Sequence, residues 1–369
     1  MHLIPALFLL FFAIESASTG AIGRMVLTAP DSAFSERLDR AQSELDTIQL
    51  CQPELGCDDV AINALALNSL GRFDLARPSL VLAQRRTPLW VLASYDYWLA
   101  SADHRFVGEQ WTFLSNVLVS DGGRNGHAGG AWFAATQAVA ALARSRNDSA
   151  TIARVQPLVA AAERHAQEHP TVFGPAFGLL DADQAEAALT FMVDTVHARW
   201  PLATGFLALA LYEYHRETEA FAVLRNLARA DDSRAAMFVL PLVRGLIGWD
   251  VDVPNRAIAV EPHLPAAWTS VSLSNLRAGV HDVNVSLERA AGTYRIHLTK
   301  TTNTPLSLRL SPALPPGARV SAVTVNEADA PVQLEETQHD VHVVVDAMLR
   351  REVTVEIEYS VPRPRRSVP

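Results

Sequence analysis

The chain has 369 residues, of which 49% are hydrophobic and 19% are charged, as expected for a packed globular protein. Its formal net charge of −9 argues against a nucleic-acid partner, because a phosphate-binding surface needs a basic stripe. The one basic cluster lies in the proline-rich tail, residues 362–369, which we expect to be disordered.

The first 18 residues are predicted to be a secretory signal peptide. Ile4–Ile14 is an apolar run of h-region length, too short to span a hydrocarbon core of about 30 Å. Ser16 and Ser18 supply the small residues for a cut after Ser18. A buried N-terminal helix or a misplaced start codon are the alternatives. A cut signal implies a secreted or periplasmic protein, and no later apolar run is long enough for membrane insertion.

Cys51 and Cys57 are the only cysteines of the chain. Pro53 and Gly56 favour a turn between them, so the loop can close as a disulfide in an oxidising compartment. Two free thiols are the main alternative. A closed zinc site needs about four ligands, and no nearby histidine completes one.

Residues 19–250 are predicted to form a helical domain. Apolar residues recur at spacings of three and four, as in Trp90, Leu92, Tyr95 and Leu99. Short breaks require neighbouring helices to pack as antiparallel hairpins, which can close into a toroid or stack as an open solenoid. No fixed-period repeat is present. The expected helices are 33–50, 58–70, 74–84, 88–101, 104–118, 130–146, 149–168, 182–197, 201–215, 217–229 and 233–247.

Residues 251–361 are predicted to form a β-sandwich, because apolar residues there alternate with period two between turn signals. The expected strands include 271–276, 283–287, 294–298, 306–310, 341–345 and 353–359. The predicted fold class is therefore mainly α with a C-terminal β domain: an (α/α) toroid, complete or incomplete, followed by an antiparallel β-sandwich.

Several segments resemble the bacterial amylo-α-1,6-glucosidase and glycogen-debranching-like branch of the six-hairpin glycosidases. Their order along the chain carries more weight than any one of them, and together they cover most of residues 70–290. The segments are Thr87–Trp98, Gly129–Leu142, Trp200–Phe206, Leu242–Gly248 and His263–Pro265.

The resemblance implies a glycoside-hydrolase-like protein, and such hydrolysis uses two carboxyl groups at the scissile bond. This sequence departs from the family pattern at the expected acids. Ala128 stands where an acidic residue precedes the Gly129-Gly130 pair, and the second acidic stretch before the last helix has no match. The loops expected to be catalytic are short, and we expect no counterpart of the family's large N-terminal β domain in these 369 residues. We therefore expect the catalytic acids to be depleted.

Asp121 and Asp194 are the two candidate catalytic acids. Asp121 lies in a glycine-rich loop, where a turn-forming role is the simpler interpretation. Asp194 and His197 are three residues apart on one helical face, which also describes an ordinary surface pair. Asp181 and Asp183 are typical of first-turn helix residues.

Three tryptophans are candidate sugar platforms, because the apolar face of a pyranose stacks on an indole. Trp90, Trp132 and Trp200 lie near the starts of predicted helices, but buried tryptophans are also common in helix packing. His127 is a candidate sugar ligand in the glycine-rich loop, or simply a loop histidine.

These residues predict a protein of carbohydrate metabolism that acts on or binds an α-linked glucan or oligosaccharide, without a metal or cofactor. One alternative is a non-catalytic carbohydrate-binding or interaction scaffold on the same fold. Another is a helical interaction module with an appended β-sandwich. The sequence does not predict the sugar, the anomeric outcome or the oligomeric state.

Overall fold

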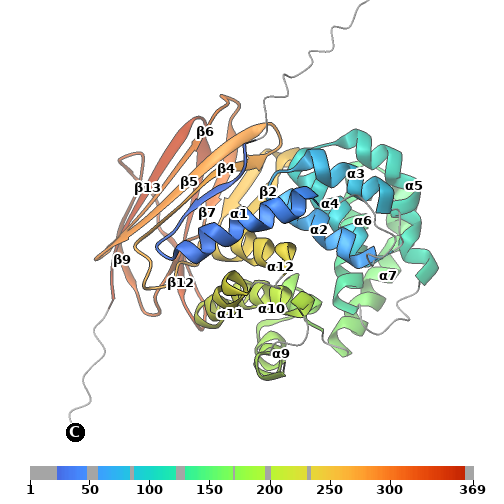
Figure 1. Ribbon diagram of the computed structural model, residues 1–369, viewed down its shortest axis with the longest axis horizontal. Coiled ribbons are helices and arrows are strands. Elements are labelled where there is room, and N and C mark those ends of the chain that lie inside the picture. The colour runs from blue at the N-terminus through green and yellow to red at the C-terminus, as the bar shows by residue number, and fades with distance from the viewer. Residues whose placement is uncertain are drawn as a thin grey trace, which may run out of the picture.

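The computed structural model describes residues 23–47, 57–83, 87–121, 129–168, 171–195, 201–230 and 234–361. Within these ranges a helical body is followed along the chain by two β-sheets (Figure 1). The predicted fold class is confirmed. Among the described helices, none is long and apolar enough to cross a membrane.

The helical body contains elements of very different length. Their bounds are α1 (Ser32–Thr47), α2 (Cys57–Ser69), α3 (Phe73–Ala83), α4 (Pro88–Ser101), α5 (His104–Asp121), α6 (Gly129–Ser145), α7 (Ser149–Glu168), α8 (Phe173–Ala176), α9 (Ala182–Thr195), α10 (Pro201–Glu213), α11 (Glu217–Arg229), α12 (Ala235–Leu240) and the π-helical turn η1 (Pro241–Leu246). The single-turn helix α8 is not predicted by the sequence, since four residues are too short for a periodic signal.

Six of the described helices form a closed inner ring, in the order α2, α4, α6, α8, α10 and α12, with α12 packing back onto α2. The remaining helices pack outside this ring. For example, α3 contacts α2 and α4, α7 contacts α6, and α11 contacts α10. A ring of inner helices with outer partners is an (α/α) toroid, so the open solenoid is excluded (Figure 1).

Local sequence explains where the inner helices start and how closely they pack. Thr87 caps α4 by accepting a hydrogen bond from the Trp90 N–H, and Pro88 occupies the first turn, where no N–H is needed. Gly205, in the Trp200–Phe206 segment, faces Met237 of α12, and a Cβ there would overlap the Met237 backbone. The glycine therefore lets α10 and α12 approach closely.

The β part contains two sheets. Their strands are β1 (Val26–Thr28), β2 (Trp249–Asp252), β3 (Ala257–Val260), β4 (Ser270–Ala278), β5 (His281–Ala290), β6 (Thr293–Lys300), β7 (Leu306–Leu310), β8 (Ala313–Leu314), β9 (Arg319–Val325), β10 (Ala328–Asp329), β11 (Gln333–Glu336), β12 (Val341–Leu349) and β13 (Glu352–Ser360). A short 3-10 turn, η2 (Val253–Asn255), joins β2 to β3.

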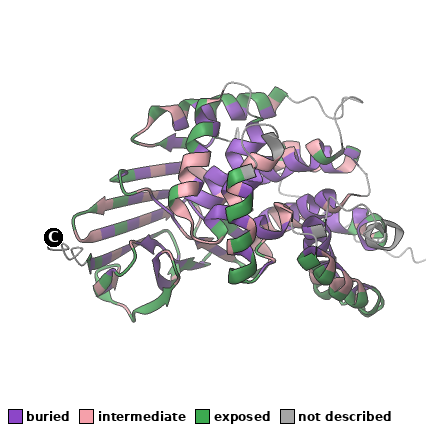
Figure 2. Cartoon of the chain, turned by 90° about the horizontal axis from the view of Figure 1, so that it is seen from below, coloured by how far each residue is buried: buried purple, intermediate pink, exposed green. Residues whose placement is uncertain are grey.

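One sheet has the strand order β1-β4-β5-β6-β13-β9-β10, and the other has the order β11-β12-β7-β3-β2, with β8 beside β12. Every pair is antiparallel except β3 and β7. β5 shows why the period of two predicts a strand: Val283, Val285 and Leu287 are buried, whereas Asn284 is exposed. The alternation is visible along the strands in Figure 2.

The sequence does not predict β1, which lies before the first helix yet pairs with β4. Three residues are too few to show alternation, and the partner strand lies about 245 positions later. The N-terminal end of the described chain is therefore built into the β-sheet.

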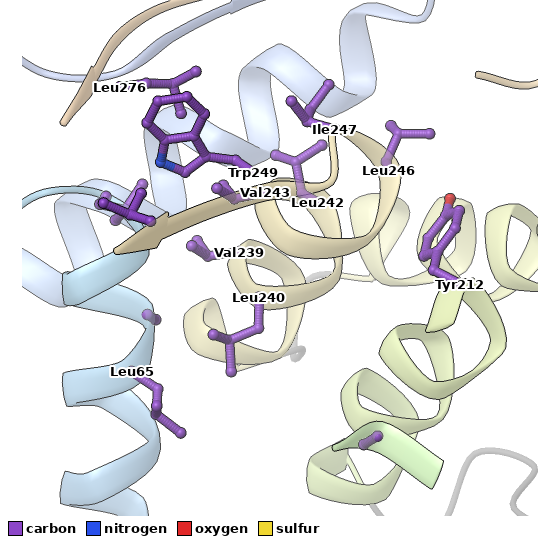
Figure 3. Close-up of a cluster of buried hydrophobic side chains, with 14 of the residues drawn as sticks. Leu65, Tyr212, Val239, Leu240, Leu242, Val243, Leu246, Ile247, Trp249 and Leu276 are labelled. Atoms are coloured by element: carbon purple, nitrogen blue, oxygen red, sulfur yellow. The ribbon is translucent and has the colours of Figure 1, made fainter. Parts of the chain in front are cut away.

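Two tryptophans pack between the helical body and the sheets. The ring of Trp268 makes edge contacts with Phe34 of α1 and Phe221 of α11, with centroid separations of 5.1 and 5.3 Å. Trp249 is buried beside Leu276 of β4, as Figure 3 shows. Both parts of the chain therefore share one continuous core.

Candidate functional site

Two cavities meet at the end of the ring where the helices reach the first strands. The ring cavity, of about 490 Å³, is lined by α2, α4 and α6 and includes Tyr95, Gln137 and Arg144. The junction cavity, of about 450 Å³, is lined by the end of α10, by β2 and β3, and by part of β12. Phe177, Arg244 and Asp250 line both, so the two cavities adjoin.

A larger hollow of about 880 Å³ lies on the face of the seven-stranded sheet, over β5, β6, β9 and β13. Two of its charged groups, Arg295 and Glu356, form an ion pair at 2.8 Å. The hollow lies on one sheet, away from the helical ring, and contains no carboxyl group with a raised pKa among the described residues, so it is a weaker candidate than the two adjoining cavities.

Arg244 organises the carboxyl groups at the meeting point of the two cavities. Its guanidinium forms an ion pair with Asp96 of α4, and its Nε donates to the Ser69 hydroxyl of α2 at 2.9 Å. The other Asp96 oxygen accepts from the Asn68 amide at 2.9 Å. Asp96 is therefore a fully engaged, ion-paired carboxylate.

Asp250, on β2, has a different environment. Its side chain is accessible from the cavities, but the surrounding walls remove much of its water. This burial raises the pKa of the Asp250 carboxyl, although the charge of Arg244 and a hydrogen bond from the Val251 N–H act in the opposite direction. Asp250 therefore holds a proton more readily than a free aspartate.

Glu213 and Glu261 also line the junction cavity. Loss of water around the Glu213 carboxyl raises its pKa and the negative charge of Glu261 raises it further, although His215 and His263 act in the opposite direction. The cavity thus contains two carboxyl groups with raised pKa values beside a fixed positive charge. Such an arrangement can both donate and accept a proton.

Three histidines lie in the wall of the junction cavity and pack together. They are His215, which follows α10, His263, which follows β3, and His342 of β12, with ring centroids 4.6 to 5.9 Å apart. Asp340 contacts two of them: its Oδ2 is 2.9 Å from His342 Nε2 and 3.4 Å from His215 Nδ1. Although burial alone would raise the pKa of Asp340, its contacts with His215, His342 and Thr337 hold that pKa well below the usual range.

The described tryptophan candidates do not line either cavity. Trp90 is buried, and its indole N–H donates to the Leu80 carbonyl oxygen at 2.9 Å, which is a packing role. Trp132 is also buried, with no hydrogen-bond partner for its indole nitrogen. The structure thus places both in the helical core and not among the carboxyl groups.

Two of the acidic candidates, Asp181 and Asp194, are not among the residues that line the described part of either cavity. Asp194 is exposed on α9, and Asp121 is the last residue of α5, with a side chain outside the described part. Asp181 serves as a helix cap, because its Oδ1 accepts from the Gln184 N–H at 2.8 Å. His127, His197, Trp200 and Cys51 lie outside the described residues, as does the side chain of Cys57, so the disulfide stays a prediction.

Sequence reasoning missed Glu213, Asp250 and Glu261 as site residues. Asp250 ends the apolar junction segment Leu240–Trp249, and Glu213 ends the apolar helix α10. An acidic residue that directly follows an apolar run was the available signal. It is weak by itself, because helix and strand ends carry acidic residues for many reasons.

No family model and no curated protein matches the chain. Solved structures do match it in fold. An α-L-rhamnosidase from Dictyoglumus thermophilum superimposes with a TM-score of 0.66 at 10% identity, over 91% of this chain and 50% of its own. The Streptomyces avermitilis α-L-rhamnosidase complexed with L-rhamnose superimposes with a TM-score of 0.61 at 9% identity, over 91% of this chain and 42% of its own. The Aspergillus terreus α-L-rhamnosidase superimposes with a TM-score of 0.56 at 12% identity, over 89% of this chain and 50% of its own.

The chain spans about half the length of these rhamnosidases. At such identities the likeness concerns the fold and not the reaction. The amylo-α-1,6-glucosidase branch suggested by the sequence is not distinguished from other toroid glycosidases. The chain has a glycoside-hydrolase-like (α/α)-toroid fold with a C-terminal β domain.

Proposed function

We propose that the chain is a carbohydrate-processing protein that binds an α-linked oligosaccharide in the adjoining ring and junction cavities. We further propose that Asp250 and Glu213 assist cleavage of its glycosidic bond. One observation carries this proposal: two carboxyl groups face one cavity of a glycosidase-like toroid, beside Arg244. These acids differ from the two that the sequence nominated.

The cavity walls suit a sugar. Leu92, Leu99 and Phe177 offer apolar surface, and Gln137 and Arg144 offer hydrogen-bond donors for hydroxyl groups. Each cavity is within the size range of small-ligand sites, about 300–1,000 Å³. We propose an α-linked glucan fragment as one candidate ligand, on the sequence resemblance, and an α-L-rhamnoside as another, because proteins of similar fold are α-L-rhamnosidases.

The charges next to each carboxyl group decide which role we assign to it. Burial raises the pKa of Asp250, but the positive charge of Arg244 partly offsets that effect, so we assign Asp250 the role of base or nucleophile. Glu213 lies near Glu261 and is assigned the proton donor to the leaving oxygen. Hydrolysis requires this division between one protonated and one ionised group.

Binding without cleavage is the second candidate function. It is favoured by Ala128, which occupies the position of an expected family acid, and by Asp96, whose charge is already neutralised by Arg244. Under this alternative the cavities hold a sugar, while hydrolysis is very slow because the acids are depleted.

Both candidates are tested by measuring binding and hydrolysis on a panel of maltooligosaccharides, isomaltose and α-L-rhamnosides. We expect Asp250→Asn and Glu213→Gln each to lower the hydrolysis rate by roughly 100-fold or more, since each acid–base role contributes about 10²–10⁴. Glu288→Gln, an exposed change on β5, is the control and should leave the rate unchanged. Binding with no hydrolysis by the unmodified protein supports the second candidate, and no binding to any sugar contradicts both.

A further inference from the structure

The three clustered histidines and Asp340 bring four metal-ligating side chains to one point of the fold. The ligating atoms of His215, His263, Asp340 and His342 all lie within 4.8 Å of one another. The residues come from three separate parts of the chain: the turn after α10, the segment after β3, and the start of β12. No spacing along the sequence reveals such a group.

The hydrogen bonds of His342 direct the lone pair of one ring nitrogen at a carboxylate oxygen, an arrangement that requires a cation between the two atoms. His342 Nδ1 is 2.9 Å from the Ser311 carbonyl oxygen, which can only accept, so Nδ1 carries a proton. In a neutral ring, Nε2 then presents a lone pair, and it faces the Asp340 Oδ2 at 2.9 Å. Two lone pairs at this distance repel each other unless a proton or a metal ion lies between them.

The other members are oriented by neighbours in the same way. His263 Nδ1 lies 3.2 Å from a Glu217 oxygen, which fixes its proton there and leaves Nε2 as a lone-pair donor. The Thr337 hydroxyl donates to Asp340 Oδ1 at 2.6 Å, so Oδ2 is free to face the histidines. Metal-binding histidines usually have such a partner on their second nitrogen.

His215 completes the group as a buried nitrogen without a hydrogen-bond partner. Its Nδ1 is shielded from solvent, makes no hydrogen bond of normal geometry, and is 3.4 Å from Asp340 Oδ2. Buried polar atoms of this kind are rare and call for a ligand or a partner.

We propose that His215, His263, Asp340 and His342 bind one divalent transition-metal ion, with zinc as the best-suited species. Two ligands about 2.0–2.1 Å from a tetrahedral ion lie roughly 3.3 Å apart, close to the 2.9 and 3.4 Å separations at Asp340. Separations as wide as 4.8 Å must close by about 1.5 Å for all four to bind. Imidazole nitrogens with one carboxylate oxygen are a typical ligand set for zinc.

The surrounding charge also suits a cation. Glu217 contacts His263, and a Glu261 oxygen lies 3.4 Å from His342 Nδ1, so acidic groups surround the cluster. The bound ion joins the end of α10 to β12 and to the segment after β3, and so fastens the helical ring to the β domain beside the junction cavity. The histidines line the junction cavity, but the metal site can be present whether or not the carboxyl groups there cleave a sugar.

The experiment is a calorimetric zinc titration of tag-free, chelator-treated full-length protein, paired with thermal unfolding with and without zinc. We expect one zinc ion per chain and a higher Tm in its presence, because an ion that binds only the folded state stabilises it. His215→Asn is the key variant. His215 has a φ of +60°, which asparagine adopts more readily than most residues, so the imidazole is removed while the turn is kept.

We expect His215→Asn and His263→Ala each to weaken zinc binding by more than about 100-fold. Such a loss exceeds the effect typical of removing a residue that only hydrogen-bonds to a metal ligand. His297→Ala, on β6 and hydrogen-bonded to Thr354, is the matched control and should bind zinc as the unmodified protein does. Circular dichroism confirms that each variant is folded. No stoichiometric zinc binding, or equal binding by His215→Asn, would overturn the proposal and leave a proton as the cation between His342 and Asp340.

Discussion

The Gly248 carbonyl oxygen accepts a hydrogen bond of 2.9 Å from the Glu261 N–H. A second bond, from the His263 N–H to the Leu246 oxygen, also measures 2.9 Å. Two backbone hydrogen bonds therefore join the turn that ends the helical body to the segment that carries Glu261 and His263. The two junction segments that resemble the six-hairpin glycosidases, Leu242–Gly248 and His263–Pro265, therefore lie side by side, and Gly248 and His263 line the junction cavity.

Gly248→Ala is expected to destabilise the protein by about 2–4 kcal/mol. The residue has a φ of +64°, and an added Cβ would overlap the Glu261 backbone, so strain and overlap act together. Gly317→Ala is the control, since it has a φ of +72° but no atom near the added Cβ, and should cost only about 1 kcal/mol. Urea unfolding measures the free energy of unfolding of both variants. Equal losses of stability would show that the contact between Gly248 and the Glu261 backbone tolerates a side chain.

Arg244→Ala is expected to cost about 2–4 kcal/mol, because it leaves the largely buried Asp96 without its counter-charge. Adding Asp96→Asn should recover part of that loss, since the orphaned charge is then removed. Arg309→Ala, which breaks the exposed pair with Glu335, should cost less than about 1 kcal/mol. A double-mutant cycle gives the coupling, and a value near zero would mean that the pair does not hold η1 against α4.

The charge of Asp103 is expected to stabilise the protein at neutral pH and not in acid. Burial alone would raise the pKa of Asp103, but hydrogen bonds from the Phe106 N–H, the Tyr97 hydroxyl and Arg77 lower it below the usual value. A lowered folded-state pKa gives stability that is full above the unfolded pKa and is lost as pH falls through the folded one.

The measurement is the stability difference between the unmodified protein and Asp103→Asn from pH 7 down to pH 3. We expect a constant difference above about pH 5 that shrinks below about pH 4. Asparagine can still cap α5, so the difference reports mainly the charge. Asp194→Asn, at an exposed site, is the control and should show little difference at any pH. A difference for Asp103→Asn that grows in acid would contradict the assignment.

Export is expected to remove the first 18 residues and to oxidise Cys51 and Cys57. Intact mass spectrometry of exported protein should show a chain that starts at Thr19 and lacks two hydrogens. A full-length mass with two alkylatable thiols would reject both parts of this prediction.

The sequence predicted the fold well because local periodicity decides most of it. The alternating faces of β5 and the apolar inner helix α4 are read directly from their residues. The short strand β1 was missed because its partner β4 is remote in the sequence, and α8 because it is a single turn.

The candidate site was harder to predict, because closing the ring brings distant residues together. Glu213 and Asp250 are 37 positions apart, and each stands at the end of an apolar element, where a capping or surface role is the ordinary interpretation. The histidine cluster is more remote still, since His215 and His342 meet only when the β domain packs on α10. Trp90 shows the opposite case, in which a suggestive residue proves to be helix packing.

The most direct test of the central claim is the hydrolysis rate of Asp250→Asn under saturating oligosaccharide, compared with its affinity for the same sugar. If the cavity carboxyl groups act on the glycosidic bond, the affinity stays close to that of the unmodified protein while kcat falls by roughly 100-fold or more. An unchanged kcat at unchanged affinity would contradict the account and place the acting acids elsewhere in the chain.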